Sequence, residues 1–304
     1  MTSWFVQGID ISRWQPYVDF RAAARGGIWF AFIKASEGTY PDAKFTEHWA
    51  GSRGLLLRGP YVFFRPDIAD EVSIETQIRT MYNTVSKTGD LGELPPVLDA
   101  ERTPCTWEQI AEAMDWMEQL FGRQPLLYTS LGFVQELGPP PNWVRQKNWP
   151  LWIAQYTDAP QPILPEGWDT WVFWQFTSQG RIPGYDGNID RNRFNGSLRQ
   201  LFEFAGMTQD EAVWWRLNRL EYMLTGVAVS DPPTEIPGAG VPYRVTAFKL
   251  RVRKGPGVQY PTVGLLDQGE IVYVKEINNE GQAYAPWGRI GEERWISLLF
   301  AEPV

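Results

Sequence analysis

The sequence predicts an α/β protein, an irregular β/α barrel followed by a second, small all-β domain. Up to about residue 205, short apolar runs typical of buried strands alternate with segments that have the apolar spacing of helices. From Tyr243 onward, short alternating runs are separated by turn residues and no helical period appears. A doubly wound open sheet is the alternative, but no Gly-rich phosphate loop follows any predicted strand.

The barrel prediction depends on eight strand segments with helices between most of them. The predicted strands are 5–11, 28–35, 57–64, 96–99, 126–129, 151–155, 171–176 and 188–190. The predicted helices between the first five strands are 18–25, 43–53, 70–87 and 106–121. Thr106 is the expected N-cap of the last of these helices. Helical patterns are weak after Tyr128, so we expect the later part of the barrel to be irregular.

The predicted domain boundaries follow these changes of pattern. Residues 1–206 form the barrel domain, 207–240 a connector and 241–304 the all-β domain. The connector begins with a helical spacing of apolar residues over 208–224, which predicts an amphipathic helix packed on the barrel or on a partner. It continues with a Pro/Gly-rich stretch at 230–240, typical of a semi-extended linker.

Composition excludes several classes of function. The net charge is −8, from 28 basic and 36 acidic residues, and no Lys/Arg-rich run occurs, so we expect no nucleic-acid partner. No stretch approaches 18 uninterrupted apolar residues, so we expect no membrane insertion. The first eight residues lack the basic and apolar regions of a signal peptide. We therefore expect a protein that reaches its site of action after release, or one secreted with a leader that this sequence does not carry.

The most informative motif is Asp99-Ala100-Glu101, at the end of a short predicted strand. Side chains two apart in a strand point to the same face, so this strand tip carries two carboxylates that face one way. Two like charges so close raise the pKa of one of them. The pair then supplies a protonated acid beside an ionised base, as cleavage of a glycosidic bond requires.

Other polar residues also lie at predicted strand ends, where the chemistry of a β/α barrel is located. Asp10 ends the first strand and Asp190 the last, and these two strands become neighbours when a barrel closes. We therefore expect both carboxylates to converge on Asp99 and Glu101 as catalytic candidates. The candidate substrate contacts are the remaining strand-end residues and one tryptophan suited to stacking on a sugar ring: Lys34, Glu37, Tyr61, Tyr128, Gln155, Gln175 and Trp152.

The sequence predicts no cofactor and no His-based metal site. His48 is the only histidine, and its neighbours suit a surface helix. The single cysteine, Cys105, excludes an intrachain disulfide. A Ca²⁺ or Mg²⁺ site made of carboxylates alone stays open at this point.

Eight segments, in order along residues 5–200, resemble the family 25 glycoside hydrolases, lysozymes of the Chalaropsis type. They are Gly8–Ser12, Phe32–Gly38, Gly59–Tyr61, Leu98–Glu101, Leu127–Thr129, Leu151–Tyr156, Trp174–Phe176 and Ile189–Asn192. The resemblance implies an irregular β/α barrel that cleaves the β-1,4 bond between N-acetylmuramic acid and N-acetylglucosamine. It also implies Glu101 as proton donor, Asp10, Asp99 and Asp190 as the other active-site carboxylates, and Tyr61 and Tyr128 as cleft tyrosines. One departure is Val62, where the family often has a histidine.

The segment from Tyr243 resembles a bacterial SH3 domain of the type appended to cell-wall enzymes. Leu250–Gly257 is similar to its opening strand and turn, and Gly264–Glu270 and Trp295-Ile296 to later parts. The order of enzyme, linker and wall-binding domain resembles an endolysin and implies bacterial peptidoglycan as the partner. The sequence gives no indication of the oligomeric state.

Three other functions were weighed against the lysozyme interpretation. A non-catalytic cell-wall carbohydrate-binding protein would not need the four acidic residues. A wall amidase or endopeptidase would need zinc ligands or a Cys/His pair. A chitinase-type barrel would carry further acidic residues where Pro95, Pro96, Val97 and Leu98 stand. The group that attacks the anomeric carbon stays open between an enzyme nucleophile, a base-activated water and the N-acetyl carbonyl of the substrate.

Overall fold

The chain forms two compact units, Met1–Val229 and Ser230–Val304, each of which is described by itself. A computed structural model describes residues 5–226, 241–274, 276–278 and 286–303. The predicted Pro/Gly-rich linker at 230–240 lies outside these residues. Among the helices that are described, none is long and apolar enough to cross a membrane.

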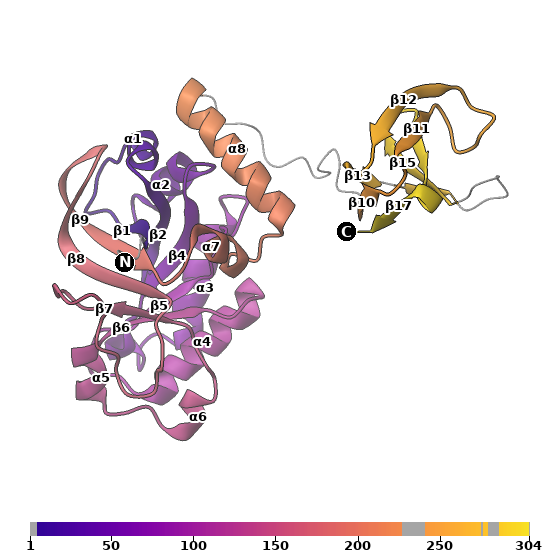
Figure 1. Ribbon diagram of the computed structural model, residues 1–304. Coiled ribbons are helices and arrows are strands. Elements are labelled where there is room, and N and C mark those ends of the chain that lie inside the picture. The colour runs from indigo at the N-terminus through magenta and orange to yellow at the C-terminus, as the bar shows by residue number, and fades with distance from the viewer. Residues whose placement is uncertain (1–4, 227–240, 275, 279–285, 304) are drawn as a thin grey trace. The chain divides into compact units, whose positions relative to one another are not determined.

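The first unit is built around a closed barrel of eight strands, which confirms the predicted fold class (Figure 1). The strands are β1 (Val6–Ile11), β2 (Ile28–Glu37), β4 (Leu57–Phe63), β5 (Val97–Asp99), β6 (Leu126–Ser130), β7 (Leu151–Ala154), β8 (Phe173–Ile182) and β9 (Tyr185–Phe194). All neighbouring pairs from β1 to β8 are parallel. The ends of the barrel close because β9 pairs with both β8 and β1.

Helices cover the outside of the barrel and connect its strands. They are α1 (Phe20–Arg25), α2 (Phe45–Ser52), α3 (Ile74–Ser86), α4 (Trp107–Phe121), α5 (Leu131–Leu137), α6 (Asn142–Arg145) and α7 (Leu198–Phe204). Thr106 is the N-cap of α4, as predicted. Its hydroxyl accepts a hydrogen bond from the Gln109 N–H, and the Gln109 side chain accepts one from the Thr106 N–H. Short connections complete the unit: the two-residue strand β3 (Tyr40–Pro41) and the 3₁₀ turn η1 (Pro66–Ile68).

The last strand differs from the prediction. It was expected only over 188–190 with Asp190 at its end, but β9 runs from Tyr185 to Phe194, antiparallel to its neighbours. Asp190 lies in the middle of this strand and directly opposite Asp10 of β1. The polar composition of β9 hid its length, because several of its side chains face a cavity or solvent rather than the core.

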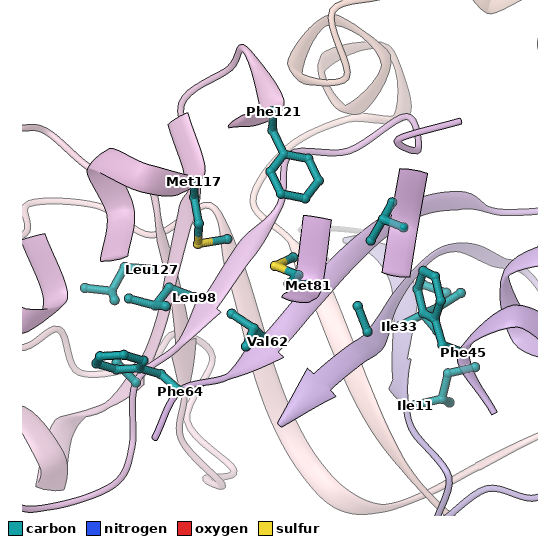
Figure 2. Packing of buried hydrophobic residues seen from close by; sticks show 14 of the residues in the cluster. Ile11, Ile33, Phe45, Val62, Phe64, Met81, Leu98, Met117, Phe121 and Leu127 are labelled. Carbon is teal, nitrogen blue, oxygen red and sulfur yellow. The ribbon is translucent and has the colours of Figure 1, made fainter. Parts of the chain in front are cut away.

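A layer of apolar side chains lies between the strands and the outer helices (Figure 2). Ile33, Val62 and Leu98 come from three strands, and Met81 and Met117 come from α3 and α4. Burying side chains of this size contributes about 1.5–3 kcal/mol each. This layer holds the strands in register and therefore also positions the residues that face the inside of the barrel.

Aromatic rings fill the interior of the barrel. Phe30 and Phe32 of β2 point inward, and the ring of Phe32 stacks on Trp152 at 4.3 Å. Two glycines on the neighbouring strands make room for these rings, because a Cβ on Gly8 would lie 2.2 Å from Phe30 and one on Gly59 2.6 Å from Phe32. Side chains alternate between the two faces of a strand, so Lys34, two residues after Phe32, also points into the barrel. It lies at the end where the parallel strands finish.

His48 lies on α2, a helix on the outside of the barrel, but on its inner face, where the side chain is buried. Residues 45, 48, 49 and 52 form the inner face of the helix, at i, i+3, i+4 and i+7. The ring of His48 packs edge-on against Phe20, and burial lowers its pKa. We infer that the imidazole is neutral and contributes to packing.

Helix α8 (Gln209–Thr225) packs against α1 and α7 of the first unit. Its N-cap is Thr208, whose hydroxyl accepts a hydrogen bond from the Glu211 N–H. The C-terminal end follows the usual pattern, with Gly226 in the left-handed conformation at a φ of 75°.

The second unit contains strands in two sheets. One sheet has the order β13-β10-β17 and the other β12-β11-β16-β15-β14. The strands are β10 (Val241–Val245), β11 (Lys249–Arg253), β12 (Thr262–Asp267), β13 (Ile271–Val274), β14 (Glu276–Asn278), β15 (Trp287–Gly291), β16 (Arg294–Ser297) and β17 (Ala301–Pro303). Val252 and Ile296 are central to its small core. The described part is therefore β-structure apart from the 3₁₀ turn η2 (Leu298–Phe300), in agreement with the predicted all-β character.

Candidate active site

A cavity of about 280 Å³ opens at the end of the barrel where the parallel strands finish. The four predicted catalytic carboxylates, Asp10, Asp99, Glu101 and Asp190, all line it. Most of the predicted substrate contacts line it as well: Lys34, Tyr61, Tyr128, Trp152 and Gln175. Side chains from all eight barrel strands thus meet in one place, although they are up to 180 residues apart in the chain.

Glu37 and Gln155 do not line the cavity. Glu37 lies beside it and pairs with Lys34 at 2.9 Å. Gln155 holds the connection after β7, because its side-chain oxygen accepts a hydrogen bond from the Ile163 N–H at 2.7 Å. We therefore regard Gln155 as a residue that shapes the rim.

Several residues at the cavity were not among the predicted site residues. Ser12, Trp14 and Gln15 follow β1, Phe63 ends β4, and Tyr156 follows β7. Trp14 is 71 % exposed, which is unusual for an indole and leaves its face open to a ligand. The sequence feature that could have identified Trp14 is its position just after the strand that carries Asp10. The buried Asn192, opposite Gln175 on β9, was missed because an asparagine in a polar run has no distinctive pattern.

Asp10 and Asp190 form a pair across two strands. They are register partners in β1 and β9, and their carboxyl groups share a hydrogen bond. Burial raises the pKa of Asp10 well above its ordinary value, and repulsion from Asp190 raises it further. Burial also raises the pKa of Asp190. Because two carboxylates in contact cannot both ionise easily, we infer that this pair shares a proton.

A network of fixed hydrogen bonds orients Asp10. Its Oδ2 accepts one bond from Gln175 Nε2 at 3.0 Å and another from Asn192 Nδ2 at 2.7 Å. Trp152 Nε1 donates to Asn192 Oδ1 at 2.8 Å, and the hydroxyls of Tyr128 and Tyr156 donate to Gln175 Oε1 at 3.0 and 2.9 Å. Both amides are therefore held with their N–H groups toward the carboxylate.

The tyrosines can serve as permanent donors because their hydroxyls stay protonated. Burial raises the pKa of Tyr128 well above its usual value and that of Tyr156 to about 12. Asp10 Oδ2 accepts two amide hydrogen bonds, so its other oxygen is the one left for the proton shared with Asp190. Asp10 is thus a pre-oriented group, fixed before any substrate arrives.

Asp99 and Glu101 form the second acidic pair, on one strand end as predicted. Asp99 is buried, and its Oδ1 has no hydrogen-bond partner among the residues that the structure describes. Burial raises the pKa of Asp99 well above its ordinary value, and the charge of Glu101 adds to the shift. Burial among the cavity walls also raises the pKa of Glu101, although Glu101 as a whole residue is the most exposed of the four acids.

Lys34 is the cation of this site. It acts against burial and lowers the pKa of both Glu101 and Asp99. Its ammonium lies 4.9 Å from the centre of the Phe63 ring and 2.9 Å from Glu37 Oε2. Burial opposes the ionisation of Glu37, but Lys34 outweighs it, so the pKa of Glu37 is lowered. Lys34 therefore supplies a positive charge that limits how strongly Asp99 and Glu101 hold their protons.

The donor set does not favour a metal. Among the residues described, no group of three or more His, Cys, Asp and Glu side chains could hold a metal ion. The acids are arranged in pairs that share protons and accept amide hydrogen bonds.

Comparison with known proteins agrees with this geometry. The sequence profile of glycosyl hydrolases family 25 matches residues 9–185, which include every cavity acid except Asp190. The chain belongs to glycosyl hydrolases family 25. It is therefore a glycoside hydrolase, and its mixed α/β barrel is the fold of that family.

A lysozyme, a muramidase and a solved lysozyme structure are each similar to about two thirds of the chain. Lysozyme M1 of Streptomyces globisporus is 31% identical over 216 residues, which cover 67% of this chain and 72% of the relative. The N,O-diacetylmuramidase of Chalaropsis sp is also 31% identical, over 66% of this chain and 99% of the relative. The crystal structure of a bacterial lysozyme from Streptomyces coelicolor is 30% identical with a TM-score of 0.58, and the match covers 67% of this chain and 98% of that one.

Val62 stands where the resemblance to the family implied a histidine. Its side chain is fully buried in the outer apolar layer, near Met81 and Leu98 (Figure 2). It does not line the cavity. In this member of family 25, no catalytic function can therefore come from the side chain at that position.

Proposed function

We propose that this family 25 glycoside hydrolase is a lysozyme that cleaves the β-1,4 bond between N-acetylmuramic acid and N-acetylglucosamine in peptidoglycan. The observation that carries the proposal is the meeting of four carboxyl groups with raised pKa values in one cavity lined by Tyr, Trp and Phe side chains. Glycoside cleavage needs a protonated acid beside anionic groups, in a setting that also offers apolar faces to sugar rings. The names of the relatives, a lysozyme and a muramidase, point to the same reaction.

Glu101 is the proposed proton donor. It lines the cavity and is the most exposed of the four acidic residues, so an incoming glycosidic oxygen can reach it. Its raised pKa favours the protonated form that a general acid needs. Proton transfer to the leaving oxygen breaks the bond to the anomeric carbon, and positive charge develops on the sugar ring.

Asp99 is proposed to orient the 2-acetamido group of the substrate. Its buried Oδ1 lines the site without a hydrogen-bond partner in the described part of the chain, so an amide N–H of the sugar could complete its hydrogen bonding. The acetamido carbonyl would then point at the anomeric carbon, which favours substrate assistance over the other attacking groups left open by the sequence.

The same contact would also change which of Asp99 and Glu101 holds the proton of their pair. In the free enzyme Asp99 competes with Glu101 for it, because the pKa of Asp99 is raised by burial and by the Glu101 charge. A hydrogen bond from the substrate N–H favours the ionised form of Asp99. The proton would then rest on Glu101, where the reaction needs it.

Asp10 and Asp190 are proposed to stabilise the positive charge that develops on the ring. The negative charge that remains on this pair is fixed in position by Gln175 and Asn192. An oriented anion that needs no rearrangement during the reaction stabilises the transition state more than it stabilises the neutral substrate.

Digestion of purified peptidoglycan tests this proposal. The products are reduced with borohydride and analysed by mass spectrometry. A muramidase gives reduced muramic acid at the new ends. Reduced glucosamine would mean a glucosaminidase, and absence of new reducing ends would favour the non-catalytic wall-binding alternative.

We further propose that the second unit is an SH3-like module that binds the bacterial cell wall. Its strand β11 presents Lys249, Arg251 and Arg253 along a groove of about 750 Å³ that also contains Leu265 and Trp287. No acidic side chain lines this groove among the residues described, although the chain as a whole has a net charge of −8. Such a surface suits the carboxylates or phosphates of wall polymers, and tethering raises the local concentration of an insoluble substrate.

Co-sedimentation of the full chain with cell walls tests this module. Arg251→Glu reverses a charge in the groove, and Arg199→Glu reverses one on an exposed helix of the first unit as the matched control. We expect the first variant to leave more protein in the supernatant and the control to behave as the wild type. Equal sedimentation of both variants would argue against wall binding by this groove.

A further inference from the structure

Helix α8 carries apolar residues on two opposite faces. One face packs on the first unit through Trp215 and Arg219, which are both buried. On the other face Val213, Leu217, Leu220 and Leu224 are 48, 62, 50 and 70 % exposed. A helix that covers a domain from one side normally turns polar residues to water. These four residues, named here the outer stripe, therefore need a different explanation.

The spacing of the outer stripe is that of a coiled-coil seam. Its members are 4, 3 and 4 residues apart, so at 3.6 residues per turn they form one narrow row along the helix. Apolar positions at alternating intervals of 3 and 4 are those that insert as knobs into a partner helix. A continuous exposed apolar row of this kind is typical of an interaction site.

The charges beside the outer stripe select its partner. At 100° per residue, Arg216 lies on one flank, and Asp210 and Glu221 lie on the other. In a parallel pair of identical helices, each flank meets the opposite flank of the second helix, so Arg216 faces Glu221 of the other copy, five positions later. In an antiparallel pair like flanks would meet and repel. The charge pattern therefore complements itself in a parallel arrangement only.

A membrane surface is a poorer match for the same face. Helices that lie on membranes carry Lys and Arg around their apolar stripe and bind anionic lipids. Here Asp210, Glu211 and Glu221 outnumber Arg216 among the exposed charged residues of α8. The acidic balance of the helix disfavours an anionic surface.

The helix is held rigidly enough to act as a docking element. Arg219 Nη2 donates to the carbonyls of Ala24 and Ile28 at 2.9 and 2.7 Å, and its guanidinium lies 3.6 Å from the centre of the Trp29 ring. At the C-terminal end Arg21 donates to the carbonyls of Met223 and Leu224, both at 2.8 Å. Little further ordering of α8 is needed when a partner binds, which lowers the entropic cost of association.

We infer that the outer stripe of α8 is a self-association surface through which two copies of this chain form a parallel helix pair. The seam is short, so the dimer should be reversible, with a dissociation constant of about micromolar order. In a parallel pair both chains continue from the same end of the helices. If the second unit binds walls as proposed, two such units then act together on one surface; the dimer itself does not depend on that function.

Sedimentation velocity of the full chain, from about 1 to about 100 μM, tests the inference. The wild type should shift reversibly from monomer to dimer. Leu217→Glu places a charge in the middle of the seam and should weaken association more than tenfold. Ile163→Glu, the same type of change at an exposed residue of the first unit, should leave it unchanged. Thermal unfolding should be alike in both variants, because both side chains are exposed.

Charge exchange tests the orientation. Arg216→Glu or Glu221→Arg alone should weaken the dimer by a few-fold, and the double variant should restore it, because the flanks are again complementary. A chain that stays monomeric over the whole range would overturn the inference, as would a dimer that Leu217→Glu does not affect or that the double variant does not restore. Protection of the outer-stripe side chains from hydroxyl-radical labelling in a monomer would also overturn it, since the same chain would then cover the stripe.

Discussion

The two acidic pairs of this active site contain similar residues in contrasting settings. Asp10 and Asp190 face each other across two strands, and amide and hydroxyl donors fix Asp10 on one side. Asp99 and Glu101 lie on one strand end, where Asp99 has a free buried oxygen and Glu101 is open to the cavity. The protein alone supplies the hydrogen bonds that fix Asp10, whereas the substrate is proposed to supply the missing hydrogen bond to Asp99.

This contrast shows how environment divides the work among like residues. A carboxyl whose hydrogen bonds are all made by the protein is suited to a fixed electrostatic function. One that lacks a partner is suited to bind substrate, and one that is reachable and has a raised pKa is suited to give up a proton. We therefore expect substitutions in the two pairs to have different consequences.

The largest effect is expected from Glu101→Gln. Removing the proposed proton donor should lower kcat by about 10²- to 10⁴-fold, because general acid catalysis contributes that much. Thermal stability should not fall, since the side chain is accessible and its amide is isosteric. Glu37→Gln, a glutamate beside the cavity that does not line it, is the control and should keep most of the activity in a turbidity assay on cell walls. Near-full activity of Glu101→Gln would remove this residue from the mechanism.

The next effect is expected from Asn192→Ala, in the fixed pair. It removes a donor to Asp10 at 2.7 Å and the acceptor of Trp152 Nε1 at 2.8 Å, so a buried indole N–H is left without a partner. We expect kcat to fall about 10- to 100-fold and the free energy of unfolding to fall by about 1–3 kcal/mol. Asn195→Ala loses only a hydrogen bond to the Trp171 carbonyl and should affect stability without a comparable loss of kcat. Equal losses of kcat in both variants would mean that Asn192 acts through the fold alone.

A smaller effect, on pH dependence, is expected from Lys34→Met. Lys34 lowers the pKa of Glu101, so its removal should raise that pKa. The acid must hold its proton to act, and activity is lost as pH rises through its pKa, so the alkaline limb of kcat/KM should move to higher pH. Glu37→Gln removes the partner of Lys34 but keeps the cation, and its alkaline limb should not move upward. A downward shift for Lys34→Met would contradict the proposed electrostatics.

The smallest effect is expected from Tyr156→Phe. Gln175 Oε1 keeps its bond from Tyr128, so the amide should stay oriented toward Asp10. We expect kcat to fall only a few-fold, consistent with loss of one of two hydrogen bonds. Steady-state kinetics on a soluble peptidoglycan fragment would measure this, with Tyr17→Phe, an exposed tyrosine, as control. A loss as large as that of Asn192→Ala would mean that the network depends on each donor.

Much of the first unit could be predicted from sequence, because apolar periodicity reports burial. The strands that lead to Lys34, Tyr61 and Asp99 are buried on both faces, so they appear as nearly continuous apolar runs. Asp190 was correctly predicted to lie near Asp10. It was expected at the end of a strand, however, and it lies in the middle of an antiparallel one. The polar sequence of β9 gave only a short strand signal at 188–190, and the later part of β8 gave none, because their side chains face the cavity or water.

The hydrogen-bond partners in the site could not be predicted. The functions of Gln175 and Asn192 depend on whether each amide turns its NH2 group or its oxygen toward Asp10. That orientation is set by the donors Tyr128, Tyr156 and Trp152, which come from other parts of the chain. The outer stripe on α8 was visible as helical periodicity, but only the fold shows that a second face of the same helix is already occupied.

The central claim is that a substrate amide binds Asp99 and leaves the proton on Glu101, while Asp10 and Asp190 stay unchanged. Carbon-13 NMR titration of the carboxyl groups, with and without an N-acetylated sugar fragment, measures this directly. The account predicts that the fragment lowers the pKa of Asp99, raises that of Glu101 and leaves the Asp10–Asp190 titration where it was. A fragment that shifts Asp10 and Asp190 instead, or four acids that all titrate at ordinary values, would contradict it.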